Sequence, residues 1–370
     1  MNFNALLSAG AGQTVLSVVL AILILLAMIT VHEFGHFVAG RALGFSVDEF
    51  SIGFGPALLK VRGKKRGTLF SVRALPLGGY CAFTGEDGEC AEARSFNNMH
   101  PLKRIVVLVA GATFNYIAAL LIIIAMTFAF GQAAYRVNAV EYDPAYPTEY
   151  SLCDGDVITA VNGRDIYLAS DLVSALNGMA AGQTAAVDVV RGGESVRANV
   201  MLRADCFFKN SSSVSAAFRA LGVDTFTAED GEYYDLSSVN CRFTFWESLS
   251  RSFVYSFKMA GSIFTVLGEL LTGNLGLSAV GGPVTTIKLT GEMAVQGMQS
   301  FLLIAAYIGV NLAVFNLLPI PALDGSKVVF CLIEWIFKKP VPRKIEQAVH
   351  VAGLFAIIAF AVAVDILQFV

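Results

Sequence analysis

The sequence predicts a membrane α-helical protein with about four transmembrane helices, a β-rich region after the first helix and a small mixed domain after the second. Of its 370 residues, 55% are hydrophobic and only 15% are charged, which is too apolar for an ordinary soluble chain of this length. Four apolar runs approach the roughly 20 residues that a spanning helix needs: residues 15–38, 105–130, 301–318 and 351–370. The net charge of -3, without a strongly basic domain, excludes nucleic-acid binding.

Lys and Arg residues are concentrated in two segments, residues 41–103 and the stretch that follows the third apolar run. The residues before Val15 and after Val351 contain neither Lys nor Arg. The positive-inside rule therefore predicts that both basic segments are cytoplasmic and that both chain ends lie outside. With this topology the first and third runs end at the same leaflet, so His32 and Asp324 are both expected near the cytoplasmic surface.

The segment between the first two runs has the pattern of short strands separated by Gly and Pro. Alternation in "TLFSVRAL" favours β-structure, and Gly63 to Gly67 is typical of a basic hairpin tip. A half-apolar sheet beside the first helix is expected to line a membrane-embedded cleft.

After the second run the chain becomes more polar and alternates short strands with turns. The pairs Asn162-Gly163 and Gly192-Gly193 predict tight turns between strands, and Asp171 is a candidate cap for a short helix. Residues 204–242 show no assignable fold and are expected to be a polar insertion or linker. Cys206 and Cys241 flank that segment; we expect them to be unpaired, with a disulfide as the alternative if the segment is exported.

The predicted organisation has nine segments. In chain order they are a first transmembrane helix (1–40), a cytoplasmic-side β-rich membrane-associated region (41–103), a second transmembrane helix (104–130), an outer mixed domain (131–203), the polar insertion or linker (204–242), an interfacial amphipathic helix rich in Phe and Trp (243–272), a third transmembrane helix (273–325), a cytoplasmic loop (326–349) and a fourth transmembrane helix (350–370).

The stretch "TVHEFGHFVAG", residues 30–40, contains the motif HExxH near the end of the first run. On a helix, His32 and His36 are one turn apart and face the same side, so both rings can bind one ion. Glu33 is then placed to take a proton from an attacking water, as in helical metalloprotease motifs. A chance match is the alternative, but two of only 4 histidines fall in this pattern, and ionisable residues within a spanning run are usually functional.

HExxH supplies two ligands, so a metal centre of this type needs a third. Topology leaves His100, His350 and Asp324 as candidates. Asp324 is favoured, because Pro319 and Pro321 end the third helix and leave extended backbone from which a short acidic side chain can turn inward.

Several motifs together resemble the site-2 protease family of intramembrane metalloproteases. They are HEFGH at the end of the first span and the stretch "NLLPIPALDG" at the end of the third. The stretches "EFSIGFGP", "LPLGGY", "RSFNN" and "VAGATFN" are similar to the bacterial regulator-of-sigma-E protease branch. The outer domain resembles the PDZ domain of those enzymes, which makes it an extracytoplasmic PDZ-like α+β domain.

The resemblance implies a role for each motif residue. It implies that Glu33 is the catalytic acid and base and that Asn316 contacts the substrate backbone or the developing oxyanion. Asn115 matches a further family asparagine, which either binds substrate or has a structural role. The implied zinc ligands are His32, His36 and Asp324.

We therefore expect an intramembrane zinc metalloprotease in the bacterial cytoplasmic membrane, with its active site near the cytoplasmic side. Its expected partners are single-span membrane protein substrates, such as trimmed anti-sigma factors or signal-peptide remnants, the lipid bilayer, and a peptide ligand of the PDZ-like domain. The alternative is a membrane-anchored PDZ binding module or chaperone whose metal site is structural. A transporter is disfavoured because the spans show no internal repeat.

Overall fold

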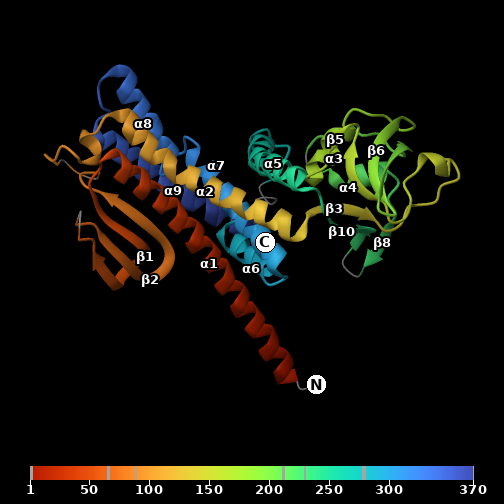
Figure 1. The fold of residues 1–370 in the computed structure, drawn as a ribbon, viewed down its shortest axis with the longest axis horizontal. Helices are drawn as coiled ribbons and strands as arrows, with labels where there is room; N and C mark the ends of the chain where they lie inside the picture. Colours follow the sequence, from red (N-terminus) through yellow and green to blue (C-terminus); the bar gives the residue numbers. More distant parts are fainter. Residues whose placement is uncertain are drawn as a thin grey trace. The chain divides into compact units, whose positions relative to one another are not determined.

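The structure is a computed structural model that describes residues 3–64, 67–86, 88, 90–210, 213–228, 231–276 and 281–369. The chain divides into two compact units, which we treat separately. The first comprises Met1–Met126 with Leu277–Val370, and the second comprises Thr127–Gly276. Figure 1 shows the elements of both.

Long helices dominate the first unit. Its helices are α1 (Phe3–Leu43), most of α2 (Pro101–Phe130), α6 (Pro283–Ala294), α7 (Met298–Leu317), α8 (Asp324–Phe337) and α9 (Arg343–Phe369). In the described parts of the chain, the helices long and apolar enough to cross a membrane are Gly12–Leu43, Pro101–Phe130, Phe245–Leu271, Met298–Leu317 and Arg343–Leu367. Four of them coincide with the predicted spans, so the protein is an integral membrane protein.

The remaining candidate span is α5 (Phe245–Leu271), which belongs to the second unit. Its most apolar window has a mean hydropathy of 1.2, against 2.9 for α1. Three buried serines repeat every fourth residue along one face, Ser248, Ser252 and Ser256, while large aromatic side chains such as Phe257 are exposed. This two-faced pattern is typical of an amphipathic helix, and the interfacial position, which its Phe and Trp residues and scattered charges predict, stays a prediction.

Two glycines let α1 and α2 approach closely beside the HExxH motif. A Cβ added at Gly35 would lie 2.5 Å from the carbonyl oxygen of Ala110 and 2.9 Å from Cα of Gly111. The two backbones are therefore in direct contact, as is common where small residues meet between membrane helices. Figure 1 shows the two helices side by side, and the contact brings the backbone of α2 to the face of α1 that carries both histidines.

The β-rich region is a long hairpin of β1 (Val47–Arg62) and β2 (Leu69–Phe83) that folds back on itself, followed by the short helix η1 (Phe96–Asn98). Residues 57–62 of β1 pair with residues 69–73 of β2, whereas residues 49–52 pair both with residues 69–72 and with residues 79–82. Residues 65 and 66 of the predicted hairpin tip lie outside the described residues. Phe37 of α1 packs on Phe50 and Phe70, with ring centroids 5.5 and 5.6 Å apart. The hairpin is thereby fixed against the end of α1 that holds the HExxH motif.

An ion pair joins the two strands of this hairpin. Arg73 Nη2 lies 2.8 Å from Glu49 Oε1, and the Ser71 hydroxyl donates to the same carboxylate oxygen over 2.6 Å. Burial opposes ionisation, but these two hydrogen bonds hold the pKa of Glu49 below its usual value.

The second unit is built on an antiparallel sheet with the strand order β10-β3-β4-β6-β7, and β5 pairs with β4. Its helices lie at Ala169–Leu176 (α3) and Val214–Ala220 (α4), and its core includes Val137, Ile158, Leu172, Val187 and Phe218. The strand and short-helix bounds are β3 (Gln132–Val137), η2 (Thr148–Tyr150), β4 (Val157–Val161), β5 (Arg164–Asp165), β6 (Thr184–Arg191), β7 (Glu194–Met201), β8 (Thr225–Ala228), β9 (Gly231–Tyr234) and β10 (Leu236–Cys241).

A turn and a helix start in this unit form where the sequence predicts them. Asn162 has φ of 51° and Gly163 has φ of 74°, which makes the tight turn between β4 and β5. Asp171, three residues into α3, accepts hydrogen bonds from the backbone N–H groups of Tyr167 and Leu168, each over 2.9 Å. The carboxylate therefore satisfies donors at the start of α3.

The structure corrects the expectation for residues 204–242. Phe218 of α4 is 3% exposed within the core, and β10 pairs with β3 along its length. The segment is therefore part of the folded unit rather than a linker, because its few apolar residues complete the core that the sheet leaves open. Cys206 and Cys241 are both unpaired.

A second difference concerns residues 273–349. Residues 273–325, expected to be one transmembrane helix, contain the two helices α6 and α7, and residues 277–280 lie outside the described residues. The stretch 326–349, expected as a loop, is largely helical, because α8 continues to Phe337 and α9 begins at Arg343. The apolar spacing of "DGSKVVFCLIEWIF" accounts for α8 as an amphipathic helix.

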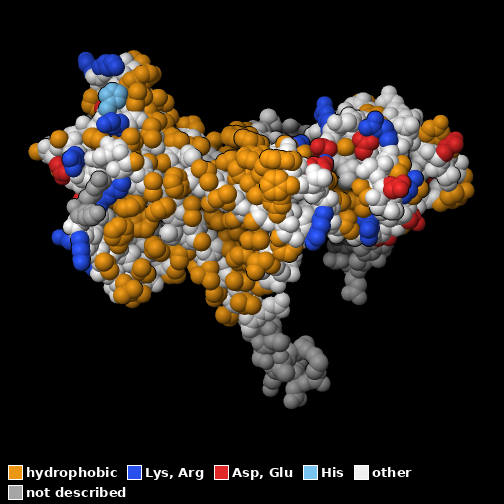
Figure 2. Space-filling model, viewed as in Figure 1, with side chains coloured by type: hydrophobic (Ala, Val, Ile, Leu, Met, Phe, Trp, Pro, Cys, Tyr) orange, Lys and Arg blue, Asp and Glu red, His pale blue; other side chains and the backbone are white. Residues whose placement is uncertain are grey.

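Apolar side chains cover the visible face of the first unit, while Lys and Arg side chains gather at its end near α8 and the hairpin (Figure 2). The exposed residues of α1 and α9 include Leu16, Leu23, Phe355 and Ile358. Such a continuous apolar surface requires lipid contact.

Candidate metal centre

The two histidines of the HExxH motif are buried on one face of α1. His32 is 8% exposed and His36 is 7% exposed, and their ring centroids are 4.6 Å apart. The spacing of one helical turn brings His32 Nε2 and His36 Nε2 to 3.0 Å. This is the convergence that the sequence predicted for the pair.

Asp324 reaches the same point from the other end of the chain. Helix α7 ends at Leu317, and α8 begins at Asp324 after the proline-containing turn. In the turn Ala322 adopts φ of 76°, and Gly325 lies so close to the Leu318 carbonyl oxygen that an added Cβ would be 2.2 Å away. The glycine of the "LDG" stretch thus allows α8 to start directly on the end of α7, which aims Asp324 at α1.

The three side chains fit one small cation. Asp324 Oδ2 lies 2.9 Å from His32 Nε2 and 3.2 Å from His36 Nε2, and the three candidate ligand atoms all lie within 4.8 Å of one another. Tetrahedral zinc with bonds of about 2.0–2.1 Å would need neighbouring ligand atoms about 3.3 Å apart. The triangle is slightly tighter than this, so zinc binding would need only a small outward movement.

Hydrogen bonds set the protonation of one ring. His36 Nδ1 lies 2.8 Å from the carbonyl oxygen of Val107, and because a carbonyl only accepts, Nδ1 must donate. The lone pair of the neutral ring is therefore on Nε2, which points at the ligand triangle. Val107 was missing from the sequence prediction, since a backbone acceptor leaves no mark in the sequence.

Gly111 of α2 forms the wall behind both rings. A Cβ there would lie 2.5 Å from His36 Nε2 and 2.8 Å from His32 Cε1. Gly111 is the glycine of the quoted "VAGATFN" stretch, so the signal was present in the sequence, although its role was not recognised.

Asn115, predicted to bind substrate, lies behind the centre. It is 0% exposed, and its Nδ2 is 3.4 Å from His32 Nδ1. Its burial against a histidine fits the structural alternative for Asn115, and the substrate contact stays a prediction. The sequence could not distinguish these roles, because both need a polar residue on the same helix face.

Glu33 and Asn316 do face an open space. A cavity of about 180 Å³ in the first unit is lined by Ile29, His32, Glu33, Leu312, Asn316, Ala322, Leu323 and Asp324. The predicted acid and base Glu33 and the predicted substrate-binding residue Asn316 therefore line the same cavity as two of the candidate metal ligands.

The other two candidates for the third ligand lie elsewhere. His100 Nδ1 accepts a hydrogen bond from the Leu102 N–H at the start of α2. His350 Nδ1 accepts one from the Ala322 N–H over 3.1 Å. Among the described residues, the cluster able to hold a metal ion is His32, His36 and Asp324.

Two imidazoles and a carboxylate next to a cavity-facing glutamate are a donor set typical of hydrolytic zinc sites, and here the set lies among apolar helices. The protein is thus a membrane-embedded metallohydrolase in class. The sequence model of peptidase family M50, the site-2 protease family, matches residues 20–360, and the chain belongs to this family.

Similar proteins agree with this assignment. The chain is 32% identical over 351 residues to a protein of Clostridium perfringens, covering 94% of this chain and 97% of the relative. It is 31% identical over 360 residues to a protein of Nostoc, covering 94% of each, and 29% identical over 354 residues to one of Campylobacter jejuni, covering 93% and 92%. All three are provisionally named as zinc metalloproteases. The chain is accordingly a zinc metalloprotease.

Proposed function

We propose that this protein hydrolyses peptide bonds within or near the transmembrane segments of single-span membrane proteins. The observation that carries the proposal is the meeting of His32, His36 and Asp324 beside a cavity that Glu33 and Asn316 also line. The two halves of the ligand set come from α1 and α8, and His32 and Asp324 are 292 residues apart in the chain.

Zinc held by these three side chains would supply the Lewis acidity that polarises a peptide carbonyl and acidifies water. Glu33 would accept a proton from the attacking water and pass it to the leaving amine. Asn316, whose side chain lines the same cavity, would donate to the carbonyl oxygen as negative charge develops there.

The hairpin is suited to hold an unwound substrate. In the described residues each of its two strands pairs only with the other, so an extended peptide can add as a further strand. The inner strand β2 passes Glu33 at Gly79, where an added Cβ would lie 3.6 Å from Glu33 Cγ. A peptide added to the hairpin would therefore run close to the catalytic groups.

The second unit, which we propose to be a PDZ-like domain on the extracytoplasmic side, would select substrates. Such a domain would bind a peptide and exclude membrane proteins with bulky outer domains, so that only shortened substrates enter. The active site would then lie near the cytoplasmic side of a bacterial inner membrane. Deleting residues 132–241, which hold all the strands of this unit, should permit cleavage of untrimmed substrates, and unchanged selectivity would contradict this filter.

The central test is a cleavage assay on single-span substrates with the purified full-length protein, with and without a zinc chelator. Glu33→Gln should lower the rate by about a hundred- to ten-thousand-fold, and chelation should abolish cleavage reversibly. Glu292→Gln is the matched control, because Glu292 is exposed on α6. Substrate binding without cleavage, insensitive to Glu33→Gln, would instead indicate a PDZ binding module or chaperone with a structural metal.

A further inference from the structure

The turn between α7 and α8, residues 318–323, leads directly into Asp324 and forms part of the wall of the metal-centre cavity. Ala322 lines that cavity together with Asp324. Pro319 and Pro321 have no N–H group to donate. Ala322 adopts a φ of 76°, which is unfavourable for a residue that has a side chain. The turn is therefore weakly stabilised by its own backbone and needs support from its surroundings.

The backbone N–H groups of this turn show where the support comes from. Those of Leu318, Ile320 and Leu323 donate to carbonyl oxygens two or three residues earlier, over 3.0, 2.7 and 3.1 Å. The N–H of Ala322 donates instead to Nδ1 of His350, over 3.1 Å. His350 belongs to α9, which supplies none of the three candidate metal ligands. One side chain of a separate helix thus satisfies the donor that the turn leaves over.

Close packing holds the His350 ring at this position. Gly353 lies one helical turn further along α9, and a Cβ added there would be only 2.9 Å from the backbone carbonyl carbon of Pro321. The glycine therefore lets α9 lie directly on the turn. On its other side the ring of His350 meets Phe330 of α8 edge-on, with centroids 5.7 Å apart. The ring is consequently fixed between α8 and the turn.

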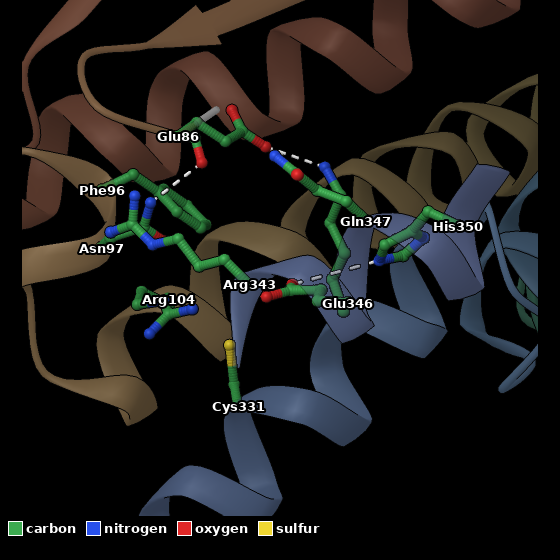
Figure 3. Close-up of a pocket in the computed structure, with 10 residues that line it drawn as sticks. Glu86, Phe96, Asn97, Arg104, Cys331, Arg343, Glu346, Gln347 and His350 are labelled. Carbon is green, nitrogen blue, oxygen red and sulfur yellow. Dashed lines mark hydrogen bonds and ion pairs between the residues drawn. The ribbon is translucent and has the colours of Figure 1, made fainter. Parts of the chain in front are cut away.

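A carboxylate on the same helix favours the form of the ring that can accept the Ala322 N–H. Because Nδ1 accepts, the proton of the neutral ring is on Nε2. Nε2 is buried, and Oε1 of Glu346 lies 4.0 Å from it. A dashed line in Figure 3 joins these two side chains, which come from successive turns of α9. The distance is too long for a hydrogen bond, but the negative charge favours a proton on the nearer nitrogen.

We propose that His350 is a positioning residue of the metal centre, which holds the turn in the conformation from which Asp324 meets His32 and His36. The inference rests on the proposed function, because it takes these three side chains as the zinc ligands. His350 is not among the residues that line the metal-centre cavity, so it acts only through the turn. Without its acceptor the Ala322 N–H loses its partner, and the turn also populates conformations in which Asp324 points elsewhere. Zinc then finds a complete site in a smaller fraction of the molecules, which lowers the apparent affinity.

A matched pair of substitutions separates the acceptor from the packing of the ring. In His350→Asn the amide oxygen lies close to the former place of Nδ1 and can accept the Ala322 N–H. In His350→Leu a side chain of similar size has no acceptor. Both variants lose the contact with Phe330. His100→Leu is the control, because His100 Nδ1 also accepts a backbone N–H, from Leu102, at an exposed position.

Two measurements on the purified full-length protein in detergent test the proposal. Competition with a chromophoric chelator would give the zinc affinity, and hydrogen exchange of the zinc-free protein, followed by mass spectrometry, would report on residues 318–325. We expect His350→Leu to lower the zinc affinity and to speed this exchange about tenfold each, the effect of one unsatisfied backbone donor. His350→Asn and His100→Leu should match the natural protein in both measurements. Thermal unfolding would confirm that each variant is folded.

Two results would overturn the positioning role. One is a zinc affinity of His350→Leu equal to that of the natural protein. The other is an equal loss in His350→Leu and His350→Asn, which would assign the effect to ring packing rather than to the acceptor.

Asp324→Ala separates this inference from the proposed function. If Asp324→Ala loses zinc while His350→Leu binds it normally, the proposed function stands and only the role of His350 fails. If Asp324→Ala binds zinc as tightly as the natural protein, the assigned metal centre is wrong, and the role of His350 fails with it.

Discussion

Asn115 Nδ2 lies 3.4 Å from His32 Nδ1, and both side chains are buried inside the first unit. Asn115 Oδ1 has no hydrogen-bond partner. When His32 Nε2 binds a metal, the proton of the neutral ring must be on Nδ1, which then needs an acceptor. A half-turn of the amide would present Oδ1 to that proton, so Asn115 would hold His32 in the form that binds metal.

Replacing Asn115 should therefore weaken zinc binding. We expect Asn115→Leu to lower zinc affinity about 10- to 100-fold, the usual cost of losing a group that orients a ligand. Competition for zinc with a chromophoric chelator would measure this affinity. Asn311→Leu is the control, because the Asn311 amide bonds within its own helix, to the Tyr307 carbonyl oxygen. Equal zinc affinity in both variants would remove the positioning role.

Gly111→Ala should disrupt the centre by steric overlap alone. The new methyl group would meet the rings of His32 and His36 at 2.8 and 2.5 Å, and rings confined between two helices can move little. We expect zinc content, measured by elemental analysis of the purified protein, to fall about tenfold or more. Gly268→Ala, which has open space around the added atom, should bind zinc normally. Full zinc occupancy in Gly111→Ala would show that the helices can separate.

Asp156→Asn should destabilise the second unit. The Asp156 side chain is fully buried and accepts two hydrogen bonds from Arg191, at 2.7 Å each, and one from the Cys153 N–H. Loss of a charged acceptor costs about 1.5–3 kcal/mol, and we expect the lower end because Arg191 is 38% exposed. Thermal unfolding of the full chain would show a lower midpoint, whereas Glu194→Gln on the exposed end of β7 should leave it unchanged.

The ion pair between Asp188 and Arg197 on neighbouring strands predicts how the stability of the folded protein changes with pH. Arg197 donates two hydrogen bonds to Asp188, at 2.6 and 3.0 Å, and thereby lowers the pKa of Asp188 below the 3.8 that is usual for an aspartate. A lowered pKa stabilises the folded state above the unfolded pKa, and this contribution is lost as the pH falls through the folded pKa.

Arg197→Gln should consequently unfold at a lower temperature than the natural protein near pH 6, with the difference shrinking below pH 3.8. Arg219→Gln, which removes an exposed charge on α4, is the comparison. A difference that grows as the pH falls would contradict the assigned sign.

Local patterns were sufficient for most elements. Apolar run length predicted α1, α2, α7 and α9, and alternation in "TLFSVRAL" predicted the hairpin, because both depend on neighbours a few residues apart. Residues 204–242 escaped this reasoning. Their structure depends on filling a core formed by distant strands, and Phe218 is buried only because that core exists.

The sequence by itself determined that the chain enters a membrane and that His32, Glu33 and His36 share one region of a helix, since helical periodicity fixes side-chain direction. Only the tertiary structure decided that Asp324, and neither His100 nor His350, meets them, and that Asn115 lies behind the histidines while Asn316 faces the cavity. Those choices depend on how α1, α2, α7 and α8 pack. Packing is set by close contacts such as that of Gly35 with Ala110, between residues far apart in the chain.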